Sequence, residues 1–423
     1  MLYAPVMVPN NSNVLEVGRA VGVERSTPTD TSGPRKRWGF RLALFATTAM
    51  MAGASAPSPF YPVLQAKFGF APVTVTMVFA VYAVALLALL LVGGSLSDHV
   101  GRRPVLSAGF GLLAISVFLF WHADTGQAFI ASRIVQGGAS GLLLSALSAT
   151  VVDLEPSHKP GSAAAWNSVS AMAGLAVGGL VAGFVLFVFE DRGATMVFGT
   201  LLVTYLLIAG AIWCLPETSP RHDGVWASLR PRASLPNSMR KAFLYAAPAI
   251  FAGWATGGLY LSLGPVIIAT QFHENSHLAR GLVVALLAGS GAVAGFLMRR
   301  RTARSISLYG TTSIAIGSAL AIGAIAMGSL WMYYVAVMIT GTGFGTAFSG
   351  ALQSLLPLIQ PGERAEVLAA VFVVCYTAFS VPAVVAGLLV PPFGLFATVC
   401  WYGAIVALLA TTAALLRQFG TRD

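Results

Sequence analysis

Charged residues are scarce in this chain: they make up 9% of its 423 residues, whereas 57% of the residues are hydrophobic. A soluble globular protein carries roughly 25% charged residues. No soluble fold of this length could withdraw so much apolar surface from water. The composition therefore excludes a water-soluble protein and makes lipid part of the solvent.

Metal-ligating and nucleophilic clusters are lacking as well. The cysteines, Cys214, Cys375 and Cys400, lie in apolar runs without the spacing of metal ligands, so we interpret them as packing residues. The six histidines fall outside the apolar runs, and no acids are paired within them. The sequence therefore predicts no enzyme, no metal site and no cofactor. A channel would need one continuous polar pore, which the sequence neither shows nor excludes.

Long apolar runs are what the chain does contain. A helix needs about 20 mostly apolar residues to cross the roughly 30 Å hydrocarbon core, whereas a barrel strand would show about ten alternating residues. Continuous runs favour helices. We predict an all-α integral membrane protein with twelve transmembrane helices at residues 40–62, 73–95, 104–121, 127–151, 166–189, 194–215, 243–270, 281–298, 305–327, 330–356, 367–390 and 394–416.

The net charge of +10 is distributed unevenly. If both termini are cytoplasmic, 21 of the 25 lysines and arginines lie in the tails and in the loops of that side. Positive residues stay on the cytoplasmic side during insertion, so this bias predicts the orientation. We interpret the basic charge as a topology signal rather than as a nucleic-acid surface.

Composition also divides the chain. We predict a disordered cytoplasmic tail at 1–37, a six-helix bundle at 38–215, a cytoplasmic linker at 216–242, a second bundle at 243–417 and a short tail at 418–423. Gly94, Leu96 and Arg103 recur as Gly295, Leu297 and Arg304 at a constant offset of 201 residues. Equivalent loops in two halves indicate a parallel duplication, with a substrate path between two pseudo-symmetric bundles.

The loop after the second span carries the most specific motif. The segment from Gly94 to Leu106, with Asp98, Gly101, Arg102 and Arg103, resembles the loop signature of the major facilitator superfamily, although His99 stands at a position that is usually basic. With twelve spans and a central linker, the resemblance covers residues 38–417. Gly101 permits a tight turn. As an alternative, the charges are solvated loop residues that follow the positive-inside bias.

The resemblance implies a conformational lock on the cytoplasmic side. In it, Asp98 pairs with Arg102 and faces the start of the eleventh helix near residues 362–367, whose free N–H groups suit a carboxylate. Asp153 joins this relay, and Glu366 lies in the facing helix start. As alternatives, Asp153 is a plain loop charge outside the relay, and Glu366 caps its helix.

Arg133 is the one charged residue well inside a predicted span. Arg133, Gln136 and Gly137 resemble the superfamily's Arg-x-x-Gln-Gly signature, whose arginine is linked to substrate or proton coupling. An intramembrane charge is a functional candidate by default. An arginine that extends to the outer headgroups is the alternative.

Gly174, Gly178 and Gly179 resemble the Gly-Pro-x-x-Gly-Gly signature of the drug:proton antiporter branch, but Leu175 replaces its proline. Close helix packing explains these glycines as well. The superfamily lines its cavity with helices 1, 4, 7 and 10. The resemblance therefore adds Tyr61, Trp254, Tyr260 and Gln353 to Arg133 and Gln136 as substrate-binding candidates, with interfacial anchoring or packing as the alternative.

The resemblance implies a monomeric secondary transporter in a bacterial inner membrane, whose partners are a small-molecule substrate and the bilayer. We predict proton-coupled efflux of a drug-like or amphipathic molecule. An uptake carrier for an organic anion or sugar is the alternative, favoured mildly by Leu175. None of the fifteen acids lies near the middle of a predicted span. If a proton gradient drives transport, the titrating groups are therefore the edge acids Asp98, Asp153 or Glu366.

Overall fold

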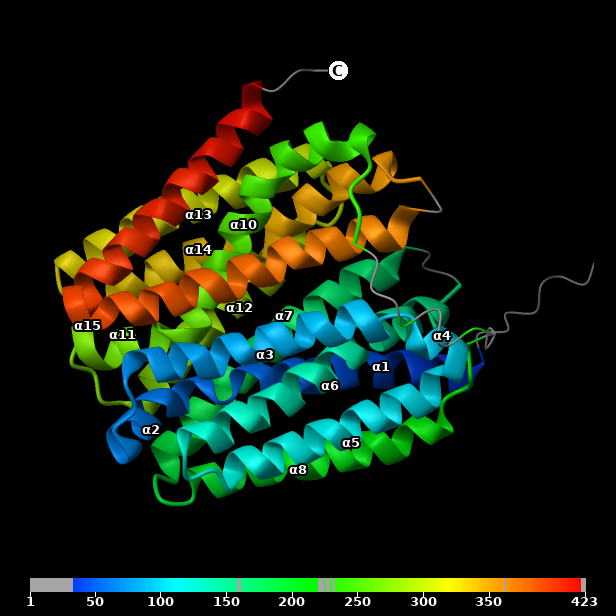
Figure 1. Ribbon diagram of the computed structural model, residues 1–423, viewed down its shortest axis with the longest axis horizontal. Coiled ribbons are helices and arrows are strands. Elements are labelled where there is room, and N and C mark those ends of the chain that lie inside the picture. Colours follow the sequence, from blue (N-terminus) through cyan, green and yellow to red (C-terminus); the bar gives the residue numbers. More distant parts are fainter. Residues whose placement is uncertain are drawn as a thin grey trace, which may run out of the picture.

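The computed structural model describes residues 33–157, 161–219, 233–360 and 363–419, together with 224 and 229. Across these residues the chain is built of helices and contains no strand (Figure 1). Residues 1–32, the middle of the predicted linker and residues 420–423 lie outside the described residues. The all-α prediction is confirmed.

Helices of the first half follow one another through short turns, and Pro57 and Pro59 interrupt the first predicted span between α1 and α2. Proline supplies no backbone N–H, so an α-helix does not continue unbroken through this pair. Helix α1 begins at Pro34, inside the predicted tail. The helices are α1 Pro34–Ser55, α2 Tyr61–Phe68, α3 Pro72–Gly93, α4 Leu96–Val100, α5 Arg102–Trp121, α6 Gly126–Asp153, α7 Ser162–Val188 and α8 Gly193–Ala211.

The second half is similar, and its first helix begins at Arg240, three residues before the predicted bundle. Its last element, α15, is two antiparallel legs joined at Gly394, whose φ of 80° is left-handed. Glycine adopts that conformation without steric cost. The helices are α10 Arg240–Ser262, α11 Gly264–Gln271, α12 His277–Met298, α13 Ala303–Ala326, α14 Leu330–Leu355 and α15 Arg364–Phe419.

Ten helices of the described chain are long and apolar enough to cross a membrane. The last of these, Glu366–Phe419, contains both legs of α15, and α1 is not among them because Arg41 and several small residues lower its hydropathy. Counting the legs separately and adding α1 gives the twelve predicted spans.

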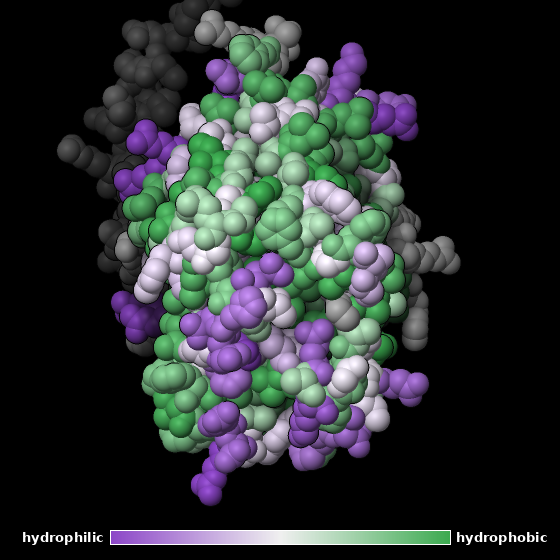
Figure 2. All heavy atoms as spheres, turned by 90° about the vertical axis from the view of Figure 1, so that its left-hand side faces the viewer, coloured by the Kyte–Doolittle hydropathy of each residue, from purple (hydrophilic) through white to green (hydrophobic). Residues whose placement is uncertain are grey.

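The two ends of the bundle differ. We call the end that carries α4, the α12–α13 loop and the start of α1 the basic end, and the end that carries α2 and α11 the distal end; they lie toward the right and the left of Figure 1. Figure 2 looks onto the distal end, where hydrophilic residues gather over the middle and lower parts of the view and hydrophobic residues cover much of the rest.

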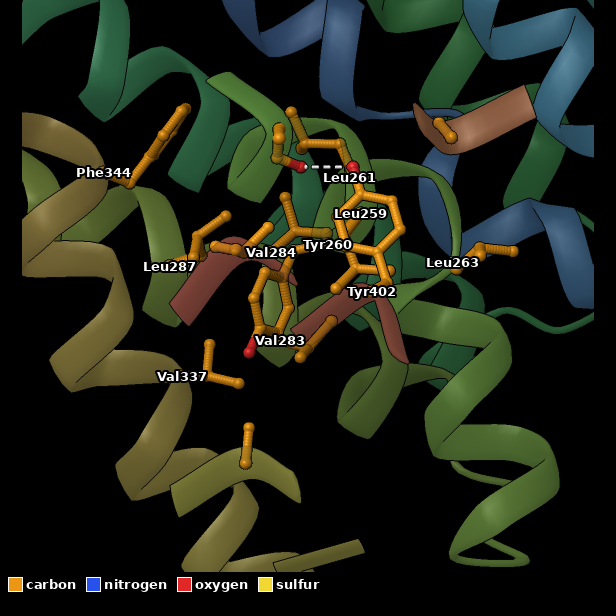
Figure 3. Close-up of a cluster of buried hydrophobic side chains, with 14 of the residues drawn as sticks. Leu259, Tyr260, Leu261, Leu263, Val283, Val284, Leu287, Val337, Phe344 and Tyr402 are labelled. Carbon is orange, nitrogen blue, oxygen red and sulfur yellow. Dashed lines mark hydrogen bonds between the residues drawn. The ribbon is translucent and has the colours of Figure 1, made fainter. Parts of the chain in front are cut away.

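The hydrophobic core joins the halves toward the distal end. One buried cluster combines Phe79, Tyr82 and Leu86 of α3 with residues of α10, α12, α14 and α15. Figure 3 shows its second-half part, where side chains of these four helices meet around Tyr260. The second half has a further cluster toward the basic end, whereas the cluster of the first half extends from Phe40 at the basic end to Phe129 at the distal end.

Polar and glycine contacts tighten this distal junction. The Ser58 hydroxyl donates to the Leu261 carbonyl at 2.8 Å, which ties the α1–α2 connection to α10. Helices α7 and α12 approach closely at Gly183 and Gly281, where a β-carbon on either glycine would meet the other helix. Small residues allow such backbone contact in membranes. The structure is therefore sealed between its halves at the distal end.

Candidate functional site

Arg102 is the centre of a polar network at the basic end. Its guanidinium forms an ion pair with Asp98, four residues earlier, and a second with Asp153 at 3.3 Å, and it donates to the Ser97 hydroxyl at 2.5 Å. Gly101, with φ of 117°, makes the turn that lets α5 begin directly after α4. The structure thus brings together Asp98, Arg102 and Asp153, as the resemblance implies.

Residues 217–219, which follow α8 and a short 3-10 helix, complete this network, and the sequence analysis missed them. The Glu217 carboxylate accepts hydrogen bonds from the backbone N–H groups of Arg102 at 2.8 Å and Arg103 at 3.2 Å. It therefore caps α5, where free N–H groups and the helix dipole favour an anion. Thr218 donates to Asp153 at 2.8 Å, and Ser219 donates to the Asp98 carbonyl at 2.9 Å.

A second acid caps α7. The Glu155 carboxylate accepts from the Ala163 N–H at 2.7 Å and from the Ser162 hydroxyl at 3.2 Å. These bonds stabilise the charged form, the Ala163 bond most, so the pKa of Glu155 lies below its usual value near 4.5. At this position the acid anchors the loop between α6 and α7.

The predicted facing helix contributes little to the network in this structure. Glu366 lies half-buried in the first turn of α15, and Gly362 lies outside the described residues. In the described chain, the ion pairs of the motif loop join Arg102 to Asp98 and to Asp153. All three residues belong to the first half. The Asp98 side chain stays 42% exposed. The lock between the halves stays a prediction.

Arg133 lies inside the first half, 1% exposed. Its guanidinium donates to the Gln136 side-chain oxygen at 2.6 Å and to the Tyr61 hydroxyl at 2.5 Å. Gln136 in turn donates to the Gly53 carbonyl at 2.9 Å, which ties α6 to α1. An arginine that extends to the headgroups does not describe this side chain, because it is buried and bonded to two helices.

The charge of Arg133 has no carboxylate beside it in the described chain, where the ion pairs all involve Arg102. Instead the guanidinium carbon lies 5.9 Å from the Tyr61 ring, 5.6 Å from the Tyr82 ring and 5.4 Å from the Phe120 ring. Aromatic faces attract cations within about 6 Å. Its Nε–H is buried without a partner. The site is a cation held by neutral dipoles and rings.

The remaining substrate candidates lie apart. Trp254 lies on α10 with its ring centroid 4.9 Å from Tyr376 and 5.6 Å from Phe348. Tyr260 is buried in the core of the second half, and Gln353 is exposed near the basic end of α14. The structure therefore brings Tyr61, Arg133 and Gln136 together but does not gather all six predicted residues at one place.

An aromatic cluster around Trp254 is the second finding that sequence reasoning did not reach. Phe379 of α15 lies 5.8 Å from Trp254 and 4.7 Å from Phe79 of α3, so the cluster crosses from one half to the other. Met51 and Met172 of the first half also pack against this core. No local pattern marks these residues, because they come from several helices.

The three glycines of α7 serve packing in this structure. Gly174 and Gly178 face the backbone of α1, and Gly179 faces Val284 of α12. A side chain at any of these positions would collide with the neighbouring helix. Their contacts agree with the packing interpretation, and a role in antiport stays a prediction.

Solved structures with a similar fold are transporters. A bacterial homolog to human lysosomal transporter Spinster, inward-facing and unoccupied, has a TM-score of 0.71 at 13% identity and covers 91% of this chain and 98% of its own. The xylose transporter XylE from E. coli, in a partially occluded inward-open conformation, has a TM-score of 0.71 at 15% identity and covers 92% and 98%. At these identities the likeness shows the fold.

Sequence relatives match over shorter stretches. An uncharacterized MFS-type transporter of Mycobacterium tuberculosis is 29% identical over 169 residues, which are 38% of this chain and 28% of that protein. Quinolone resistance protein NorA of Staphylococcus aureus is 23% identical over 126 residues, 30% of this chain and 32% of that protein. Each alignment thus spans less than a third of the relative.

The family model described as Major Facilitator Superfamily matches residues 43–383, most of the chain. This match covers both halves and includes the motif loop, the Arg133 site and the aromatic cluster up to Phe379. Together with twelve spans and the transporter fold, it establishes that the chain is a multi-pass membrane protein of the major facilitator superfamily, a transporter and not an enzyme.

Proposed function

We propose that this transporter exports small amphipathic or drug-like molecules in exchange for protons, as a monomer in a bacterial inner membrane with both termini in the cytoplasm. The observation that carries the proposal is the aromatic cluster of Trp254, Phe348, Tyr376, Phe379 and Phe79 at the junction of the halves. Aromatic faces bind flat apolar rings and cations without demanding a fixed pattern of hydrogen bonds.

The chemistry of the junction favours an amphipathic cargo over a sugar. Trp254 is partly exposed and lies beside aromatic rings, and Met51 and Met172 pack against the same hydrophobic core. Aromatic and methionine surfaces adapt to varied ligands. A sugar site would need several polar side chains directed at hydroxyl groups. The partial similarity to a quinolone resistance protein supports the same cargo class.

The conformation supports alternating access. The buried cluster that joins the halves lies toward the distal end, and the second half has a separate cluster at the basic end. If the basic end is cytoplasmic, as the charge bias predicts, this junction closes the transporter on its outer side, which is one of the states that alternating access requires. A cysteine label at residue 25 should then react from the cytoplasmic side and one at residue 275 from the outside; labelling of both from the same side would refute the twelve-span topology.

Cargo and direction are tested by accumulation of fluorescent aromatic cations in cells with and without the protein. We expect lower accumulation in producing cells and a return to control levels when an uncoupler is added. Trp254→Ala should lose export, whereas Trp331→Ala, at an 80% exposed position on α14, should keep it. Equal accumulation in producing and control cells would exclude these cations as cargo.

Proton coupling is tested on the edge acids. We propose that Asp98, Asp153 and Glu366 carry the protons, because no acid lies near the middle of a described span. In liposomes, neutralising all three should preserve downhill exchange and abolish pH-driven accumulation. A triple variant that still responds fully to the gradient would assign the proton to another group.

Uptake of an organic anion is the second candidate, and the buried charge of Arg133 is the observation that favours it. An anion would supply the missing countercharge if another conformation exposes the guanidinium. Under this alternative, producing cells take up organic anions faster than control cells do, and Arg133→Ala abolishes that uptake.

A further inference from the structure

An open groove runs along the membrane-facing side of the second half. Helix α14 forms its floor, since both α12 and α13 pack on α14, and α12 and α13 form its walls. Its volume is about 410 Å³. The residues that define it are Leu286, Val293 and Leu297 of α12, Tyr309 of α13, and Met338 and Thr342 of α14.

The groove is apolar even where it contains hydroxyl groups. The Thr342 hydroxyl donates to the Ile339 carbonyl at 2.7 Å and that of Ser290 to the Leu287 carbonyl at 3.2 Å, so both are satisfied within their own helices. Val293 and Leu297 are 59% and 69% exposed. From Leu286 to Leu297 the wall extends about 16 Å along α12, a length that suits a hydrocarbon chain.

Arginines close the basic end of this groove, because the loop that joins its two walls is Arg299, Arg300, Arg301 and Thr302. Arg299 is held over the Phe296 ring and donates to the Phe296 carbonyl. Arg304, at the start of α13, donates to the Gln418 carbonyl. Arg300 and Arg301 are exposed, and no side-chain partner of either is described.

We propose that this groove binds one anionic phospholipid, with an acyl chain along α12 and the phosphate on Arg300 and Arg301. Basic pockets between transmembrane helices on the cytoplasmic side suit anionic headgroups. Tyr309 lies about 7.5 Å along α13 from Arg304, at the level of the ester groups. The positive-inside bias explains basic residues in this loop, but not an apolar groove that ends at them.

Retention of lipid by the full-length protein tests the proposal. Protein equilibrated with equal amounts of phosphatidylglycerol and phosphatidylcholine in detergent is freed of excess lipid, and the bound phospholipid is quantified. We expect wild type to retain phosphatidylglycerol selectively. Arg300→Gln/Arg301→Gln should weaken its binding roughly thirtyfold, which corresponds to about 2 kcal/mol. Arg240→Gln/Lys241→Gln, on a helix that does not line the groove, is the charge-matched control and should bind normally.

A bulky substitution in the groove tests the acyl-chain site separately from the arginines. Val293→Trp should displace the acyl chain and lose the lipid, whereas Leu408→Trp, at a 67% exposed position on α15, should retain it. Equal retention of the two lipids by wild type, or full retention by Val293→Trp, would overturn the proposal. A wild-type dimer that Val293→Trp dissociates would assign the groove to a second copy instead.

Discussion

Removing one hydroxyl group should show how the buried charge of Arg133 is tolerated. Tyr61→Phe keeps the ring near the guanidinium but deletes the oxygen that accepts its hydrogen bond at 2.5 Å. Because the site is 1% exposed, water cannot replace that acceptor. The variant therefore leaves a charged donor unpaired inside the protein.

The expected cost follows from the charge. A hydrogen bond to a charged group contributes about 1.5–3 kcal/mol, whereas hydrogen bonds between neutral side chains within a bilayer average about 0.6 kcal/mol. Tyr205→Phe is the matched control, because its equally buried hydroxyl donates to the neutral Ala49 carbonyl at 3.2 Å. We expect Tyr61→Phe to lower the free energy of unfolding clearly more than Tyr205→Phe does.

A double-mutant cycle makes the test specific. In an Arg133→Met background the charge is gone, so Tyr61→Phe should cost little and the coupling free energy should reach about 1.5 kcal/mol or more. Reversible unfolding in mixed detergent, followed by tryptophan fluorescence, measures all four proteins. Equal costs of Tyr61→Phe in both backgrounds would refute the reasoning, since the hydroxyl would then act independently of the charge.

Three further predictions concern the basic end. Glu217→Gln should destabilise the protein by about 1 kcal/mol through loss of the anionic cap on α5, measured by the same unfolding assay, with Glu363→Gln as the control that leaves this cap intact. Asp98→Asn should insert normally but transport slowly, and a wild-type transport rate would remove its role in the lock. The Ala163 N–H lowers the pKa of Glu155, so the stabilisation of the fold by the Glu155 carboxylate is present above pH 4.5 and is lost as the pH falls through the lowered pKa. Glu155→Gln should remove this part of the acid sensitivity of unfolding. An unchanged pH profile of unfolding would contradict the assignment.

Local chemistry determined the architecture from sequence. The length of an apolar run is compared directly with the thickness of the bilayer, so the twelve spans are readable without tertiary information. The turn at Gly101 could also be predicted from the sequence. The connection between α4 and α5 needs a residue with positive φ, and the motif contains a glycine at that position. The Asp98–Arg102 pair is also local, because only the turn at Gly101 separates the end of α4 from the start of α5.

Only the tertiary structure decided which side chains meet. Glu217 caps a helix that begins 115 residues earlier, and Tyr61 reaches Arg133 across 72 residues. The aromatic cluster draws on α3, α10, α14 and α15. In a soluble protein the apolar face of a helix marks the side that is buried. Here lipid and protein core are both apolar, so hydropathy does not distinguish a residue that faces the substrate path from one that faces the membrane, and packing alone assigns it.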